Sequence, residues 1–130
     1  MRLLLDTHVL LWFISGDAQL PTEWRDSIRD VENEVYLSVV SLWEAIIKHA
    51  LGKLPLPLPA AQYLPVQRAG HRIASLPLDE ASICRLATLP ATHRDPFDRM
   101  QVCQAIEHGL TIVTGDPVFK SYPAPTLGAA

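Results

Sequence analysis

Residues 95–117 read DPFDRMQVCQAIEHGLTIVTGDP, a stretch that joins helix signals to strand signals. Asp95 suits the N-cap of a helix and Pro96 its first position, while Gly109 suits the C-cap. Residues 110–114 then form a run with strong β propensity, which ends at a turn-forming Gly-Asp-Pro sequence. A helix that leads directly into a strand is one half of a parallel βαβ unit.

The same alternation extends toward both ends of the chain. Residues 2–5 contain an unbroken apolar run, typical of a strand buried on both faces of a parallel sheet, and residues 34–39 are a second strand candidate. We further expect helices over residues 8–15, 21–31, 41–51, 60–70 and 78–86 (the last with Asp79 as N-cap), a loop over the proline-rich residues 53–59, a strand over residues 72–75, and a short strand or loose end over residues 123–130. This order predicts one domain over residues 1–130, an α/β fold of the three-layer α/β/α sandwich type with a central, mainly parallel sheet of four to five strands.

Length, composition and charge narrow the class of protein. The 130 residues and the 48% content of hydrophobic residues fit one compact domain with a real core, and they exclude a disordered chain. The net charge of −3 provides no global basic field for nucleic acid. A nucleic-acid partner must therefore be held by local positive patches or through bound metal.

The cysteines and the N-terminal residues bear on the compartment. Cys84 and Cys103 lie in apolar helical patterns and match no zinc or redox spacing, so we expect buried thiols in a reducing compartment. No apolar run reaches the roughly 18 residues of a membrane span. Asp6 and His8 interrupt the N-terminal apolar stretch, which argues against a signal peptide. We therefore expect a cytoplasmic protein without a membrane segment.

Acidic residues are placed where ligands bind in such folds, at the carboxyl edge of the sheet. Asp6 ends the first strand and Asp116 follows the strand at 110–114, while Glu44 and Asp98 lie in the first turns of nearby helices. Converging carboxylates repel one another unless a hard divalent cation such as Mg²⁺ or Mn²⁺ binds them. The absence of a paired His/Cys ligand spacing argues against zinc. A metal held by carboxylates can activate water and stabilise charge on a phosphodiester, which is nuclease chemistry.

Each acid also has a structural explanation. Glu44 fits a capping box with Ser41, or an ion pair with Lys48 one helical turn later. Acids in the first turn of a helix, as expected for residue 98, favour the helix dipole without any chemistry, and Asp116 precedes a proline as turn formers do. Asp6 is the hardest to explain in this way, because an acid at the end of a buried strand needs a partner.

Four motifs occur in a specific order along the chain: LLLDTH (3–8), SVVSLWE (38–44), HRDPFDR (93–99) and TGD (114–116). This order resembles that of PIN-domain proteins, most closely the VapC-type toxins of bacterial toxin–antitoxin pairs, and the resemblance extends to about residue 119. Many relatives carry Asn where this chain has Gly115. By this resemblance, the family's acidic, metal-binding catalytic residues match Asp6, Glu44, Asp98 and Asp116.

The resemblance also implies supporting residues. Thr7 and Thr114 match hydroxyl residues that can hydrogen-bond a site carboxylate or a metal-bound water. Asp95 is an additional acid, which we expect to act mainly as the helix cap and secondarily as an auxiliary metal ligand. His8 and His93 lie near the proposed acids, with a general-base role as a minor alternative. Four basic residues near the acids are candidates for contacts to RNA phosphates, or equally for surface charge pairs: Arg94, Arg99, Lys48 and Lys120.

The family implies Mg²⁺- or Mn²⁺-dependent cleavage of RNA, a homodimer, and a VapB-type antitoxin that blocks the acidic site. Trp12, Phe13 and Trp24 fit either an apolar groove for such partners or the core. A haloacid-dehalogenase-like phosphatase wants a second Asp two residues after the first, where this chain has His8. A phospho-receiver domain needs its acids in a different order. A non-catalytic interaction module with the same fold stays open, and it need not bind a divalent metal.

Overall fold

The computed structural model describes residues 1–91 and 94–128. At its centre lies a parallel sheet of five strands in the order β3-β2-β1-β4-β5. β1 (Arg2–Leu5) lies between β2 (Glu34–Ser38) and β4 (Thr111–Thr114), and the edges are β3 (Ala74–Leu76) and β5 (Thr126–Gly128). The predicted α/β fold is confirmed, and the C-terminal tail contributes a short strand.

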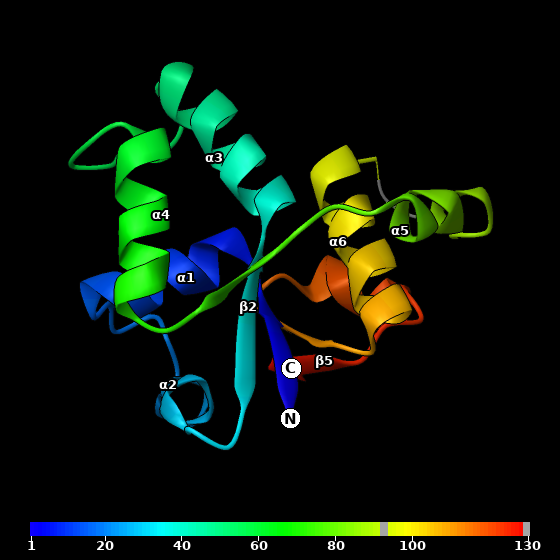
Figure 1. Ribbon diagram of the computed structural model, residues 1–130, viewed down its shortest axis with the longest axis horizontal. Helices are drawn as coiled ribbons and strands as arrows, with labels where there is room; N and C mark the ends of the chain where they lie inside the picture. Colours follow the sequence, from blue (N-terminus) through cyan, green and yellow to red (C-terminus); the bar gives the residue numbers. More distant parts are fainter. Residues whose placement is uncertain (92–93, 129–130) are drawn as a thin grey trace.

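Helices cover both faces of this sheet, with α1 and α4 on one side and α5 and α6 on the other (Figure 1). The connections between the parallel strands contain the following helices: α1 (Thr7–Ser15), α2 (Thr22–Arg29), α3 (Val39–Ala50), α4 (Ala60–Gly70), α5 (Glu80–Cys84), the short 3₁₀ helix η1 (Arg85–Ala87), α6 (Pro96–His108) and the 3₁₀ helix η2 (Pro117–Ser121). The proline-rich residues 53–59 form the predicted loop between α3 and α4.

The apolar run of β1 explains the layered core. Leu3, Leu4 and Leu5 are fully buried. Successive strand side chains point to opposite faces, so Leu3 and Leu5 join the core beside α1 and α4, whereas Leu4 packs with Val102 of α6. Each fully buried leucine contributes about 1.5–3 kcal/mol of hydrophobic stabilisation. The central strand is therefore fixed from both sides, and its carboxyl end is fixed with it.

The start of α3 differs from the prediction. We expected the helix from Ser41, but it begins at Val39 because Ser38, the last residue of β2, is its N-cap. The Ser38 hydroxyl accepts a hydrogen bond from the backbone N–H of Val40 at 3.0 Å. The capping box between Ser41 and Glu44 is therefore wrong, and Glu44 lies one turn further into the helix than expected.

β3 begins two residues later than predicted because a turn follows α4, which ends at Gly70 as expected. Ile73 N–H donates to the Arg68 carbonyl, and Arg72 adopts a left-handed conformation with φ 59°. Such a turn is a common helix ending, usually made by glycine, and it delays the strand to Ala74. Asp79 caps α5 as predicted, through a hydrogen bond from Ser82 N–H at 3.2 Å.

The two cysteines differ in exposure. Cys103 on α6 is fully buried as predicted, and burial raises the pKa of its thiol. The prediction for Cys84 was wrong, because this residue at the end of α5 is exposed. α5 has only five residues, too few to bury the whole apolar pattern. Within the described residues, no helix has the length and apolar character that a membrane crossing requires.

Candidate active site

A pocket of about 340 Å³ opens where β1 and β4 end and where α3 and α6 approach the sheet. The four acids predicted from the sequence all line it, and so does the auxiliary acid. The acidic lining consists of Asp6, Glu44, Asp95, Asp98 and Asp116, and the same pocket is lined by Lys48 and His8. His93 lies outside the described residues.

Asp6 has the partner that an acid at the end of a buried strand needs. Its Oδ2 accepts a hydrogen bond from the Thr114 hydroxyl at 2.7 Å, and its Oδ1 accepts the backbone N–H of His8 at 3.1 Å. The second bond makes Asp6 the N-cap of α1. Thr114 also accepts the N–H of Asp116 at 3.0 Å, so one hydroxyl orients both aspartates.

Glu44 is 5% exposed and reaches the pocket from α3. Its Oε1 accepts a hydrogen bond from the Thr7 hydroxyl at 3.2 Å, and its Oε2 accepts one from the Lys48 ammonium at 2.6 Å. Partial burial acts to lower the pKa of Lys48, but the hydrogen bond to Glu44 and the charges of nearby acids outweigh it and raise this pKa. The ion pair proposed from the sequence is therefore present, and it lies inside the pocket.

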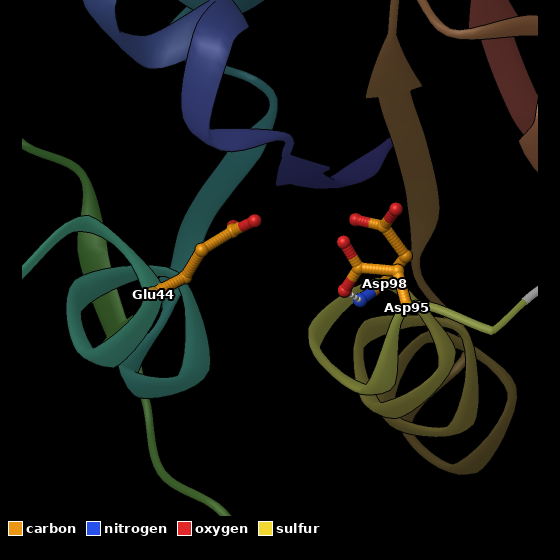
Figure 2. Close-up of side chains that lie close together, drawn as sticks. All are labelled: Glu44, Asp95 and Asp98. Atoms are coloured by element: carbon orange, nitrogen blue, oxygen red, sulfur yellow. Dashed lines mark hydrogen bonds between the residues drawn. The ribbon is translucent and has the colours of Figure 1, made fainter. Parts of the chain in front are cut away.

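Asp95 and Asp98 lie at the start of α6, facing Glu44 across the pocket (Figure 2). Oδ1 of Asp95 accepts the N–H groups of Phe97 at 2.9 Å and of Asp98 at 3.2 Å, which confirms the predicted N-cap. One carboxylate oxygen from each of Glu44, Asp95 and Asp98 lies within 4.8 Å of the other two. The capping residue thus lies in the acidic cluster as well, beside the carboxylates of Glu44 and Asp98.

Asp116 follows β4 and caps η2, because its Oδ1 accepts the N–H of Val118 at 3.0 Å. It lines the pocket but does not belong to the tight cluster of three carboxylates. The neighbouring Gly115 lies against the ring of Trp12, which an added Cβ would approach to 3.2 Å. This contact gives a steric reason for glycine at this position.

The predicted phosphate-binding residues are dispersed. Lys48 lines the acidic pocket, whereas Arg94 and Arg99 line a separate, apolar pocket. Arg99 donates from Nη1 to the Pro90 carbonyl at 2.8 Å. Lys120 is exposed on η2 and does not line the acidic pocket. Of the four candidates, Lys48 alone is placed at the carboxylates in the described part of the chain.

A family model described as the PIN domain matches residues 3–125. The chain belongs to the PIN domain family. This PIN domain is 39% identical over 64 residues to Ribonuclease VapC16 of Mycobacterium tuberculosis, an alignment that covers 49% of the chain and 45% of that relative. It is 25% identical over 123 residues to Ribonuclease VapC22 of the same organism, with 94% of the chain and 92% of the relative covered.

Solved structures show the same fold at low sequence identity. The PIN domain matches a chain of VapBC2 from Rickettsia felis, bound to a DNA fragment from its promoter, with a TM-score of 0.74 and 16% identity over 98% of both chains. A chain of DNA-bound VapBC from Salmonella typhimurium matches with a TM-score of 0.66 and 21% identity, covering 100% of this chain and 99% of that one. The PIN domain architecture thus extends over the described sheet and helices.

Proposed function

We propose that this PIN domain is a metal-dependent endoribonuclease that acts as the toxin of a toxin–antitoxin pair. The observation that carries the proposal is the convergence of five carboxylates, from four separate parts of the sequence, on one pocket. The names of the relatives, both ribonucleases, support RNA as the substrate.

The donor set fits a hard divalent cation. The pocket offers carboxylate oxygens, and His8 is its one histidine among the described lining residues. Such oxygen ligands suit Mg²⁺ or Mn²⁺ better than zinc. Asp6, Asp98 and Asp116 would hold the ion, Glu44 would place a second ion or the attacking water, and Asp95 would be an auxiliary ligand. When bound, it supplies an activated water and stabilises negative charge on the phosphodiester.

The chain's own residues prepare this site. Thr114 fixes the orientation of Asp6, and Thr7 fixes that of Glu44, so these carboxylates need little reorganisation to bind a cation. Lys48 is the residue best placed to contact an RNA phosphate near the acids, because it lines the same pocket. Arg94, Arg99 and Lys120 remain candidates for phosphate contacts further along an RNA chain.

A separate apolar pocket of about 400 Å³ is a candidate for the homodimer interface. It includes the half-exposed Trp43, which packs edge-on against Phe97 with 5.0 Å between ring centroids, and the exposed Leu78 and Ile83. Contiguous exposed apolar surface is typical of protein–protein contacts. We expect light scattering to give a dimer mass for the wild type and a monomer mass for Trp43→Arg. A monomeric wild type would exclude this assignment.

A VapB-type antitoxin is the second proposed partner. Leu11 and Ile14 of α1 line a pocket of about 150 Å³ with Leu56 of the proline-rich loop and Tyr63 of α4. This face suits an apolar segment of an antitoxin. Trp12, Phe13 and Trp24, which the sequence left open between groove and core, pack against the core cluster. RNA and an antitoxin as partners agree with the expected cytoplasmic location.

The test is cleavage of a mixed RNA pool with Mg²⁺ or Mn²⁺, using wild type, Asp6→Ala and Asp98→Ala, each purified without antitoxin. We expect metal-dependent cleavage by the wild type and its loss in both variants, with circular dichroism showing intact folding. An inactive wild type, or variants that cleave equally well, would instead favour the non-catalytic interaction module. The module also need not bind the metal, so Mn²⁺ binding separates the two functions.

A further inference from the structure

Lys48 occupies an unusual position for a lysine, because it lies within the acidic pocket. It follows Glu44 by one helical turn of α3, and 2.6 Å separates its ammonium nitrogen from Glu44 Oε2. The Lys48 side chain is 37% exposed, whereas that of Glu44 is 7% exposed. Thr7 donates to the other Glu44 oxygen, so both oxygens already have donors from this chain.

A divalent ion and the Lys48 ammonium compete for the same oxygen. Mg²⁺ binds carboxylate oxygens at about 2.0–2.1 Å and demands a nearly octahedral set of ligands. An ammonium 2.6 Å from Oε2 fills the space in which such an ion and its ligands would lie. Two like charges on one carboxylate oxygen also repel each other strongly.

The three carboxylates near Lys48 are held as one cluster. Glu44, Asp95 and Asp98 bring oxygens within 4.8 Å of one another, from α3 and α6 (Figure 2). The edge-on contact of Trp43 with Phe97 fixes the same two helices, because these aromatic residues are sequence neighbours of Glu44 and Asp98. The three carboxylates therefore stay close to one another, and a cation is needed to offset the repulsion between their negative charges.

We propose that the Lys48 ammonium is the resident cation at Glu44 and keeps a second divalent ion from binding on the Glu44 side of the Glu44–Asp95–Asp98 cluster. The catalytic ion is then held by Asp6, Asp98 and Asp116, a point that rests on the proposed function. Lys48 is a positioning residue in this scheme, since it acts by holding Glu44. It also takes the place that a second metal ion has in two-metal nucleases.

The test counts Mn²⁺ ions bound per chain, by electron paramagnetic resonance of free Mn²⁺ in equilibrium titrations. Lys48→Met and Lys48→Gln remove the charge, Lys48→Arg keeps it, and Lys120→Met removes a lysine outside the pocket. We expect Lys48→Met and Lys48→Gln to bind one more ion per chain than the wild type. Lys48→Arg and Lys120→Met keep the wild-type number. Equal numbers for Lys48→Met and the wild type overturn the proposal.

This measurement separates the proposal from the proposed function. If the wild type binds Mn²⁺ and cleaves RNA but Lys48→Met gains no ion, the nuclease function is supported and the proposed role of Lys48 is refuted. If the wild type binds no Mn²⁺ ion and Lys48→Met binds one, the role of Lys48 is supported and the metal-dependent nuclease function is refuted. Thermal unfolding gives a second readout, because Mn²⁺ should raise the Tm of Lys48→Met more than that of the wild type. An equal rise contradicts the proposal, even where the variant is poorly folded without metal.

Discussion

Thr114 on β4 donates a hydrogen bond to Asp6 at the end of β1, across 108 residues of sequence. Thr114 is fully buried, so its hydroxyl has no access to water as an alternative partner. The bond joins two neighbouring strands at the point where both carry an acid, and it fixes which way the Asp6 carboxylate faces. The two acids at the carboxyl edge are thus oriented by the sheet itself.

Replacing this threonine with valine keeps the shape and removes the hydroxyl. We expect Thr114→Val to lower the free energy of unfolding by about 1–2 kcal/mol, since hydrogen bonds to charged groups are stronger than neutral ones. Cleavage should fall about 10- to 100-fold, as is usual when residues that orient metal ligands are removed. Urea unfolding and RNA cleavage measure the two effects. Thr111→Val, on the same strand but away from the pocket, should change neither, and a Thr114→Val enzyme of normal activity would contradict the orienting role.

Ser38 and Ser41 are both buried on or beside α3 but differ in their partners. Ser38 caps the helix and donates to Gln104 Oε1 of α6 at 2.5 Å, whereas Ser41 has no hydrogen-bond partner among the described residues. Ser38→Ala should lower the free energy of unfolding by about 1–3 kcal/mol, because it removes the cap and leaves a buried amide oxygen unpaired. Ser41→Ala should be neutral or stabilising. Equal effects of the two variants in urea unfolding would refute this distinction.

Asp95 caps α6 and also lies in the acidic cluster, and one substitution can separate the cap from the charge. Asparagine caps helices about as well as aspartate, so Asp95→Asn should leave the free energy of unfolding within about 0.5 kcal/mol of the wild type. It removes a negative charge from the cluster with Glu44 and Asp98, and cleavage should change by about 10-fold or more if this carboxylate takes part. Asp95→Ala additionally loses the cap, at about 1 kcal/mol. Wild-type cleavage by Asp95→Asn would leave capping as the sole role of this residue.

Asp79 should contribute to the acid sensitivity of the fold. The hydrogen bond with Ser82 and the pairing with His108 hold the pKa of Asp79 below its usual value, although desolvation acts the other way. A carboxylate with a lowered pKa stabilises the fold above its unfolded pKa of about 3.9, and this stabilisation disappears as the pH falls through the folded pKa. Asp79→Asn keeps the cap and cannot titrate. Its stability, measured by thermal unfolding, should therefore fall less than that of the wild type between about pH 5 and pH 3.

Much of the fold could be predicted because local signals and burial agree. The strand β1 is apolar on both faces because its leucines are all buried. Asp95 and Pro96 mark the start of α6, and Gly109 marks its end. The start of α3 could not be placed, since Ser38 and Ser41 are equally good caps in the sequence. The choice between the two serines depends on where β2 ends, and the end of β2 depends on its pairing with β1 and β3.

The candidate site was predictable in part for a related reason. Acids that end strands of one parallel sheet must share an edge, so Asp6 and Asp116 follow from topology alone. The distance between Glu44 and Asp95 depends instead on how α3 packs against α6. The ion pair of Lys48 with Glu44 was visible in the sequence, but its location within the pocket required the fold.

Three acids of the pocket also begin helices: Asp6 caps α1, Asp95 caps α6 and Asp116 caps η2. The carboxylates that would act in catalysis are therefore also the N-caps that fix where these helices begin. Asn or Ser can replace Asp as a helix cap but cannot supply its charge. A substitution of this kind would remove the charge needed for catalysis but lower the free energy of unfolding only slightly. Single substitutions at Asp6, Asp95 or Asp116 can therefore remove charge from the pocket while the fold stays stable, so the acidic site can be lost in evolution without loss of the domain.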